Sequence, residues 1–175
     1  MIVLGIGNPI MGDDGIGLAI MRRLRAADSA TVDDFDWVPS HLPDQRGADL
    51  EDTIEFIDGG TSGIELLPVI QQAEDLIVLD AVAAAGAKPG TVVVLEGDQV
   101  PRLLNAKLSP HQVGLLDLLA TAKLLGHEPR RIAVVGIVPE SAELHVGLSD
   151  AAERALPQAV AAVRELMFRW QGPRI

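Results

Sequence analysis

The chain has 175 residues, a length that suits one domain with a sizeable hydrophobic core, and its formal net charge of −11 argues against a nucleic-acid partner. It contains no cysteine, which excludes a thiol nucleophile, thiolate metal sites and disulfides. No apolar run approaches the ~20 residues of a membrane span and no leader stands before the first apolar run, so we expect a cytoplasmic protein without a membrane partner.

The N-terminal segment over residues 1–17, MIVLGIGNPIMGDDGIG, predicts a buried strand, a glycine-rich turn and the start of a helix. This order resembles a dinucleotide-binding unit, but Ile10 stands where the third glycine of that fingerprint is needed. Asp13 and Asp14 also occupy the place of a pyrophosphate, at a helix N-terminus that favours an anion. The segment is therefore better suited to bind a cation.

The other elements follow from apolar runs, their spacing and the turn residues between them. They are a helix over 14–27, a long acidic loop over 28–53 with a short edge strand near 35–38, a strand over 54–57, a helix over 62–72, strands over 76–79 and 91–95, a helix over 109–126, a strand over 132–138 and a final helix over 149–170. Pro157 is expected to kink or break the final helix. The alternation predicts one α/β domain over 1–175, with a mostly parallel, twisted sheet of about five strands and helices on both faces.

Five ionisable residues are predicted at the carboxyl edge of this sheet, where ligands of α/β proteins gather. They are Asp14, Asp58, Asp80, His111 and Glu140. Each alone has an ordinary explanation as a helix cap, a turn former or a surface residue. Their convergence on one edge favours a functional site.

His111 is the most informative of the five. Residues 109–112, Ser-Pro-His-Gln, fit the N-cap and first turn of a helix, with a capping box formed by the serine and the glutamine. The helix dipole disfavours a charged imidazole at that position, which keeps the histidine in the neutral form that binds metals. His41 and His127 fall in loop-like segments that we expect to be exposed, and His145 stays a reserve candidate near the same edge.

Five separated motifs occur in one order along the chain. They are the opening GIGNPIMGDDGIG, DGGT at 58–61, DA at 80–81, SPHQ at 109–112 and GIVPE at 136–140. In these motifs the sequence resembles the maturation endopeptidases of nickel-iron hydrogenases. The resemblance implies an endopeptidase that removes the C-terminal extension of the hydrogenase large-subunit precursor after nickel has been inserted.

The resemblance also implies that Asp14, Asp80 and His111 are the metal-binding and catalytic residues. Some family members carry glutamate where this chain has Asp14, which leaves the ligand chemistry unchanged. Two carboxylates and one neutral imidazole make an open metal site with room for water or substrate. Asp13 is a possible alternative to Asp14, and Asp58 is a weaker candidate for a general base. The metal is expected to be nickel supplied by the precursor, although the isolated protein could hold another divalent ion.

Two other functions are left open. One is a nickel-binding chaperone or carrier without peptidase activity, which would use the same three ligands, and the other is a small-molecule hydrolase with a resident metal. Ser62 is a near miss for a nucleophile elbow, because the second glycine of that motif is missing. The acidic loop over 28–53 is expected to lie beside the cleft and to contact the large substrate protein.

Overall fold

Five strands form one sheet in the computed structural model, which describes residues 1–28, 54–100 and 110–171, and the side chains of all of these except 27, 28 and 110–114. The strands are β1 (Ile2–Ile6), β2 (Glu55–Gly60), β3 (Asp75–Ala81), β4 (Val92–Glu96) and β5 (Arg131–Ile137). Their order across the sheet is β2-β1-β3-β5-β4, and every neighbouring pair is parallel except β4 and β5. The predicted fold class, a mostly parallel α/β sheet, is confirmed.

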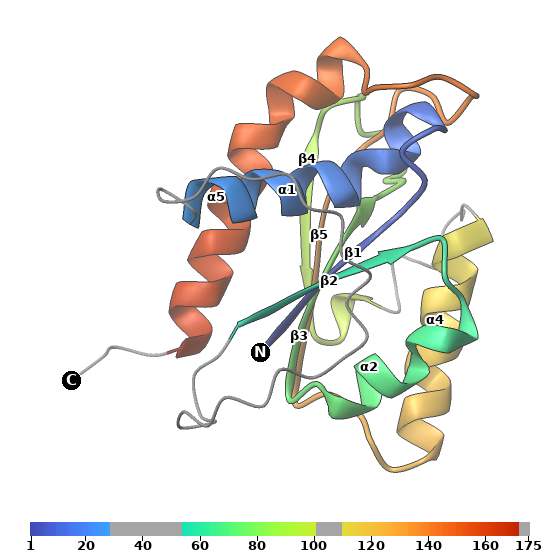
Figure 1. The fold of residues 1–175 in the computed structure, drawn as a ribbon, viewed down its shortest axis with the longest axis vertical. Helices are drawn as coiled ribbons and strands as arrows, with labels where there is room; N and C mark the ends of the chain where they lie inside the picture. The colour runs from blue at the N-terminus through green and yellow to red at the C-terminus, as the bar shows by residue number, and fades with distance from the viewer. Residues whose placement is uncertain (29–53, 101–109, 172–175) are drawn as a thin grey trace.

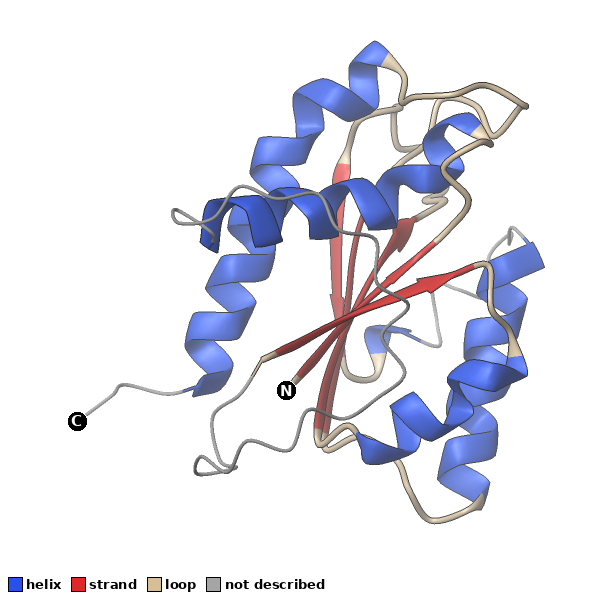
Figure 2. Cartoon of the chain, in the orientation of Figure 1, coloured by secondary structure: helices blue, strands red, loops and turns tan. Residues whose placement is uncertain are grey.

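The helices cover both faces of the sheet, as Figures 1 and 2 show. The elements are the 3₁₀ turns η1 (Gly12–Gly15) and η2 (Ile64–Leu66) and the helices α1 (Ile16–Asp28), α2 (Leu67–Gln72), α4 (Pro110–Leu124) and α5 (Asp150–Gln171). Helices α1 and α5 contact each other on one face, and α2 and α4 contact each other on the other. None of these helices combines the length and the apolarity that a bilayer crossing requires.

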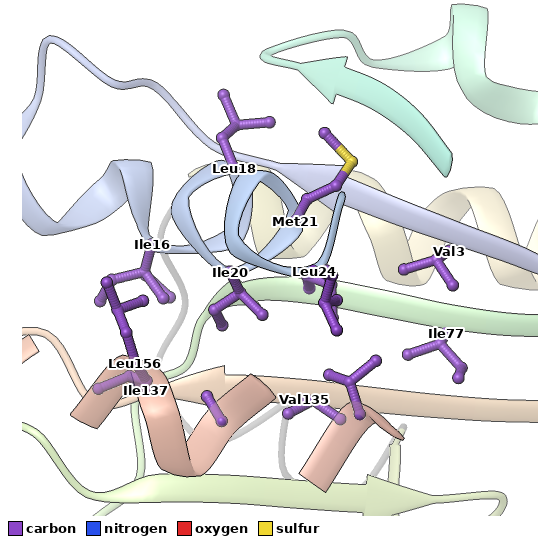
Figure 3. Close-up of a cluster of buried hydrophobic side chains, with 14 of the residues drawn as sticks. Val3, Ile16, Leu18, Ile20, Met21, Leu24, Ile77, Val135, Ile137 and Leu156 are labelled. Atoms are coloured by element: carbon purple, nitrogen blue, oxygen red, sulfur yellow. The ribbon is translucent and has the colours of Figure 1, made fainter. Parts of the chain in front are cut away.

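Strand side chains alternate between two aliphatic cores because successive residues of a strand point to opposite faces. Ile77 and Leu79 of β3 join the core under α1 and α5, whereas Leu76 and Val78 join the core under α2 and α4. Figure 3 shows the first core, in which Ile20 and Leu24 of α1 and Leu156 of α5 pack over the strands. Packing in the two cores sets where each helix lies along the strands. It therefore also sets which helix ends lie at the edge of the sheet that carries the predicted site.

The prediction that Pro157 could break the final helix was wrong, because α5 runs without interruption from Asp150 to Gln171. Proline leaves the carbonyl of Glu153 without its usual helical donor, but both residues are exposed, so water can reach that carbonyl. Buried side chains along the whole helix hold its two halves on the sheet; they are Ala152, Ala155, Leu156, Ala159, Val163 and Leu166. This burial outweighs the local cost of the proline.

The helix predicted over 62–72 is shorter than expected. It opens as η2 and becomes α-helical only at Leu67, because Pro68 suits the first turn of a helix and disfavours helical geometry before it. The acidic loop predicted over 28–53, except Asp28 at the end of α1, lies outside the described residues, as do its edge strand and His41.

Candidate functional site

The turn between β1 and α1, residues 7–15, is pressed against the ends of the central strands. Gly7 has a φ of +125°, and a β-carbon there would lie 1.9 Å from the carbonyl oxygen of Asp14. A β-carbon on Gly17 would lie 2.2 Å from the carbonyl oxygen of Leu79 and 2.3 Å from that of Ile6. Only glycine permits such approaches. Gly7 and Gly17 therefore allow η1 and α1 to pack directly on the ends of β1 and β3.

Asp14 is buried in this turn, with 7% of its surface exposed. Its Oδ2 accepts a hydrogen bond of 2.9 Å from the backbone N–H of Asn8, so the carboxylate folds back toward the end of β1. The turn η1 that carries it packs against β3. Asp14 thus lies at the carboxyl edge, between the ends of two neighbouring strands.

Asp80 is the sixth residue of β3 and is 2% exposed. Its Oδ1 accepts a hydrogen bond of 2.7 Å from the N–H of Ala81. By strand alternation with Leu76 and Val78, its side chain lies on the face that α2 and α4 cover. Since Gly17 contacts the carbonyl of Leu79, the start of α1 with Asp14 lies beside the end of β3 with Asp80. The structure thus places the turn that carries Asp14 next to the strand that carries Asp80.

His111 is the second residue of α4, as predicted for the first turn of a helix. The helix leads through a short turn into the start of β5, so it runs against the strands and its N-terminus lies at their carboxyl ends (Figure 1). The His111 side chain is outside the described set, so its approach to Asp14 and Asp80 stays a prediction. Among the side chains that are described, no three His, Cys, Asp or Glu residues gather closely enough to hold a metal ion.

Asp13 has a different environment from Asp14. It is 1% exposed, and its carboxylate accepts hydrogen bonds from the N–H of Glu140 (2.7 Å) and from the N–H (2.7 Å) and hydroxyl (2.8 Å) of Ser149. All three donors belong to the loop between β5 and α5, residues 138–149. A carboxylate engaged in this way is suited to hold two loops together.

The remaining candidates lie at exposed positions. Asp58 is the fourth residue of β2, and its Oδ1 accepts a hydrogen bond of 3.0 Å from the N–H of Gly60, as in an Asx turn. Glu140 and His145 are exposed residues of the β5–α5 loop, and the backbone of His145 pairs with Met11. His127 is exposed beyond the end of α4, as predicted.

Sequence reasoning missed two features. The sequence predicts a helix that starts at Ser149 but assigns this serine no contact, although a serine before an apolar stripe is the usual signal of an N-cap. Its hydroxyl accepts from the N–H of Ala152 (3.2 Å) while donating to Asp13. The second feature is an ion pair at the opposite end of the sheet, where β3 and β5 begin.

In that ion pair the Arg131 side chain donates to both carboxylate oxygens of Asp75, with Nε–Oδ1 at 2.7 Å, and its guanidinium lies 5.1 Å from the ring centre of Trp170. The hydrogen bond from Arg131 holds the pKa of Asp75 below its ordinary 3.8, against the opposing effect of burial, with help from the charges of Arg131 and Arg130. A hollow of about 680 Å³ lies at this end, lined in part by Glu96, Arg131 and Trp170, and it contains none of the predicted site residues. The cluster is structural in character and separate from the carboxyl edge.

Comparison with known proteins adds independent findings. A family model described as "Hydrogenase maturation protease" matches residues 44–166. The chain is 37% identical over 169 residues to the "Hydrogenase 2 maturation protease" of Escherichia coli (strain K12), covering 94% of this chain and 91% of that protein. It is also 37% identical over 169 residues to the "Hydrogenase expression/formation protein HupD" of Rhodobacter capsulatus, covering 95% of this chain and 70% of that protein.

Solved structures agree with the sequence comparisons. The hydrogenase maturating endopeptidase HybD from E. coli matches with a TM-score of 0.73 and 35% identity, covering 94% of this chain and 92% of that one. The NiFe hydrogenase maturation protease HybD from Thermococcus kodakarensis matches with a TM-score of 0.69 and 25% identity, covering 95% and 98%.

Proposed function

Because this chain belongs to the hydrogenase maturation proteases and is an endopeptidase, we propose that it removes the C-terminal extension of a nickel-iron hydrogenase large-subunit precursor after nickel insertion. In this proposal Asp14, Asp80 and His111 bind the nickel that the precursor carries. The metal is thus part of the substrate. The name of the E. coli relative, a maturation protease for hydrogenase 2, supports a hydrogenase as the target.

The observation that carries the proposal is the burial of Asp14 and Asp80 in neighbouring elements at one edge of the sheet. Their exposures are 7% and 2%; Asp14 lies in η1, after β1, and Asp80 lies near the end of the neighbouring parallel strand β3. Two carboxylates concentrate negative charge at one edge, and a neutral imidazole from the start of α4 would complete a set of oxygen and nitrogen donors. This donor set suits a divalent first-row cation and leaves positions open for ligands of the precursor.

A large protein substrate is also consistent with the surface around this edge. Ile10, Leu144 and Val146 are 53%, 79% and 80% exposed, and they lie on the two loops that meet at the Met11–His145 bridge. Exposed aliphatic side chains grouped beside a site are typical of protein-binding surfaces. We assign them to contact with the precursor near its cleavage site.

Hydrolysis of the peptide bond needs a water molecule and a base. Nickel held in this site could polarise the water or the scissile carbonyl, and Asp58 is the additional carboxylate at this edge that we propose as the base. Asp58→Asn keeps an acceptor for the N–H of Gly60 and removes the basic oxygen. A role as the base predicts a fall in kcat on the order of a hundredfold or more, whereas a role only in the turn predicts no change.

Two observations argue against the two alternative functions, a nickel carrier and a small-molecule hydrolase. A carrier without peptidase activity does not fit membership of a protease family. A small-molecule hydrolase gives no reason for exposed aliphatic side chains beside the site.

The test of the proposed ligands is cleavage of nickel-loaded precursor by Asp14→Asn, Asp80→Asn and His111→Ala variants. Each is expected to lose processing while retaining a cooperative unfolding transition. His127→Ala is the matched control, because His127 is exposed at the far end of α4, and it should cleave at the wild-type rate. Normal cleavage by Asp14→Asn or Asp80→Asn would refute the ligand assignment.

A further inference from the structure

The carboxylate of Asp13 is fully engaged by one loop. Oδ1 accepts from the N–H of Ser149, and Oδ2 accepts from the N–H of Glu140 and the hydroxyl of Ser149, all at 2.7–2.8 Å. At 1% exposure, a charged group needs this number of partners, because burying an unsatisfied carboxylate is costly. Asp13 therefore fixes the β5–α5 loop to the β1–α1 turn.

The backbone of the same turn adds further hydrogen bonds. The N–H of Gly12 donates to the carbonyl of His145 (2.7 Å), the N–H of Asp13 to that of Ser141 (3.1 Å), and the N–H of His145 to that of Ile10 (3.1 Å). The turn is thus bound to the loop along most of its length. Asp14, the next residue, shares the 3₁₀ turn with Asp13 and directs its own carboxylate toward Asn8 instead.

Ser149 connects this network to a long helix. Its hydroxyl donates to Asp13 and accepts from the N–H of Ala152 in the first turn of α5, so Ser149 is the N-cap of a 22-residue helix. The negative charge of Asp13 lies at the positive end of that helix, which is favourable. These hydrogen bonds therefore tie η1 to the N-terminus of α5, and α5 itself packs on the sheet.

We propose that Asp13 is a positioning residue for the cleavage reaction: through Ser149 and Glu140 it fixes η1 so that the Asp14 carboxylate faces the metal of the substrate. The proposal rests on the proposed function, since it takes Asp14 as a ligand. It gives the two adjacent aspartates different tasks. Asp14 contacts the metal, and Asp13 acts only through Asp14.

The test compares Asp13→Asn and Ser149→Ala with Ser149→Thr, which keeps the hydroxyl, and with Ser141→Ala. Ser141 is a serine of the same loop whose side chain contacts Glu143 and not Asp13. For each variant we would measure cleavage of nickel-loaded precursor, the affinity of the isolated protein for Ni²⁺, and the melting temperature.

Asp13→Asn places an amide N–H₂ against donors, and we expect both the cleavage rate and the Ni²⁺ affinity to fall on the order of tenfold to a hundredfold. Ser149→Ala should show a smaller fall in both, Ser149→Thr should recover most of it, and Ser141→Ala should match wild type. In an Asp14→Asn background, Asp13→Asn should cause little further loss of Ni²⁺ affinity, because a residue that acts through Asp14 has nothing left to position. If Asp13 had a purely structural role, Asp13→Asn would lower the melting temperature, and its effect on Ni²⁺ affinity would not depend on whether Asp14 is present.

Three results would overturn the proposal. The first is an Asp13→Asn variant that binds Ni²⁺ and cleaves within about twofold of wild type while Asp14→Asn is inactive, which leaves the proposed function intact. The second is a full additive loss of Ni²⁺ affinity in the double variant. The third applies if Asp13→Asn fails to fold: a folded Ser149→Ala with wild-type affinity and cleavage would then contradict it. Normal cleavage by Asp14→Asn would instead refute the proposed function.

Discussion

Asp13 and Asp14 are adjacent, chemically identical and both buried, yet their contacts separate them. Asp13 accepts three hydrogen bonds from the β5–α5 loop, whereas the Oδ2 of Asp14 accepts a hydrogen bond from Asn8, after the end of β1. The sequence alone could not choose between them, because both follow the same glycine and precede the same helix. Only the fold brings Glu140 and Ser149, more than 120 positions away, to one of the two.

At the same scale, the Asp75–Arg131 ion pair predicts a specific acid response. The pKa of Asp75 is lower in the folded protein than its ordinary 3.8, so its contribution is present above that value and is lost as pH falls through the folded pKa. We expect Asp75→Asn to lower the free energy of unfolding at pH 7 by about 1–3 kcal/mol. The difference between variant and wild type should shrink as pH falls from about 5 to about 2.

Urea unfolding across this pH range measures the effect. Asp98→Asn is the control, because it removes the same charge from an exposed position. A difference between Asp75→Asn and wild type that stays constant down to about pH 2 would show that the ion pair is not its source.

At the scale of elements, the strands and helices were predictable from apolar runs, and their ends were less so. The fully buried β3 was recognised from its apolar residues, but Asp75 and Asp80, which also belong to it, are polar. Pro157 was expected to break α5 because local sequence shows the missing donor and does not show the buried face that holds the helix together. The role of Ser149 depends on a contact with Asp13, which no local pattern reports.

Because α1 packs closely on the strand ends, we can predict how adding one methyl group at Gly17 changes the stability of the protein. In a helix, alanine is normally favoured over glycine by up to about 1 kcal/mol, but a β-carbon on Gly17 would lie 2.2 Å from the carbonyl oxygen of Leu79. We therefore expect Gly17→Ala to lower the free energy of unfolding by about 1–3 kcal/mol or more.

Urea unfolding of Gly17→Ala beside Ala161→Gly tests this expectation. Ala161 is exposed on α5, so its replacement measures the ordinary difference between alanine and glycine in a helix of this protein. A Gly17→Ala variant as stable as wild type, or more stable, would mean that α1 is not seated as described.

The two loops that meet at the Met11–His145 bridge predict how the substrate binds. Replacing both Leu144 and Val146 by serine should raise KM for nickel-loaded precursor on the order of tenfold, because each aliphatic side chain buried on binding contributes up to about 1.5–3 kcal/mol. The melting temperature should not change, since these side chains are 79% and 80% exposed.

Steady-state kinetics with purified precursor supply the measurement, and Leu124→Ser is the matched control. Leu124 is 87% exposed at the far end of α4. An unchanged KM for the double variant, or an equal rise for Leu124→Ser, would place the docking surface elsewhere.

At the scale of the whole molecule, the alternation of strands and helices was enough to predict the sheet and the edge at which its parallel strands end. The residues at that edge were predicted from their positions after the strands, and in the structure η1, which carries Asp14, packs against β3, which carries Asp80. The part played by His111 depends on the direction of its side chain, which sequence position does not determine. The different roles that we propose for the adjacent aspartates depend on contacts with Glu140 and Ser149, which no local sequence pattern shows.

The most direct test of the central claim, that Asp14, Asp80 and His111 recognise nickel carried by the precursor, is a gel assay of cleavage with nickel-loaded and nickel-free precursor. Wild-type protein should cleave only the nickel-loaded form, and adding free zinc to the nickel-free form should not restore cleavage. Asp80→Asn should cleave neither form. Cleavage of nickel-free precursor by the wild type would contradict the account and would indicate a peptidase that does not read the metal of its substrate.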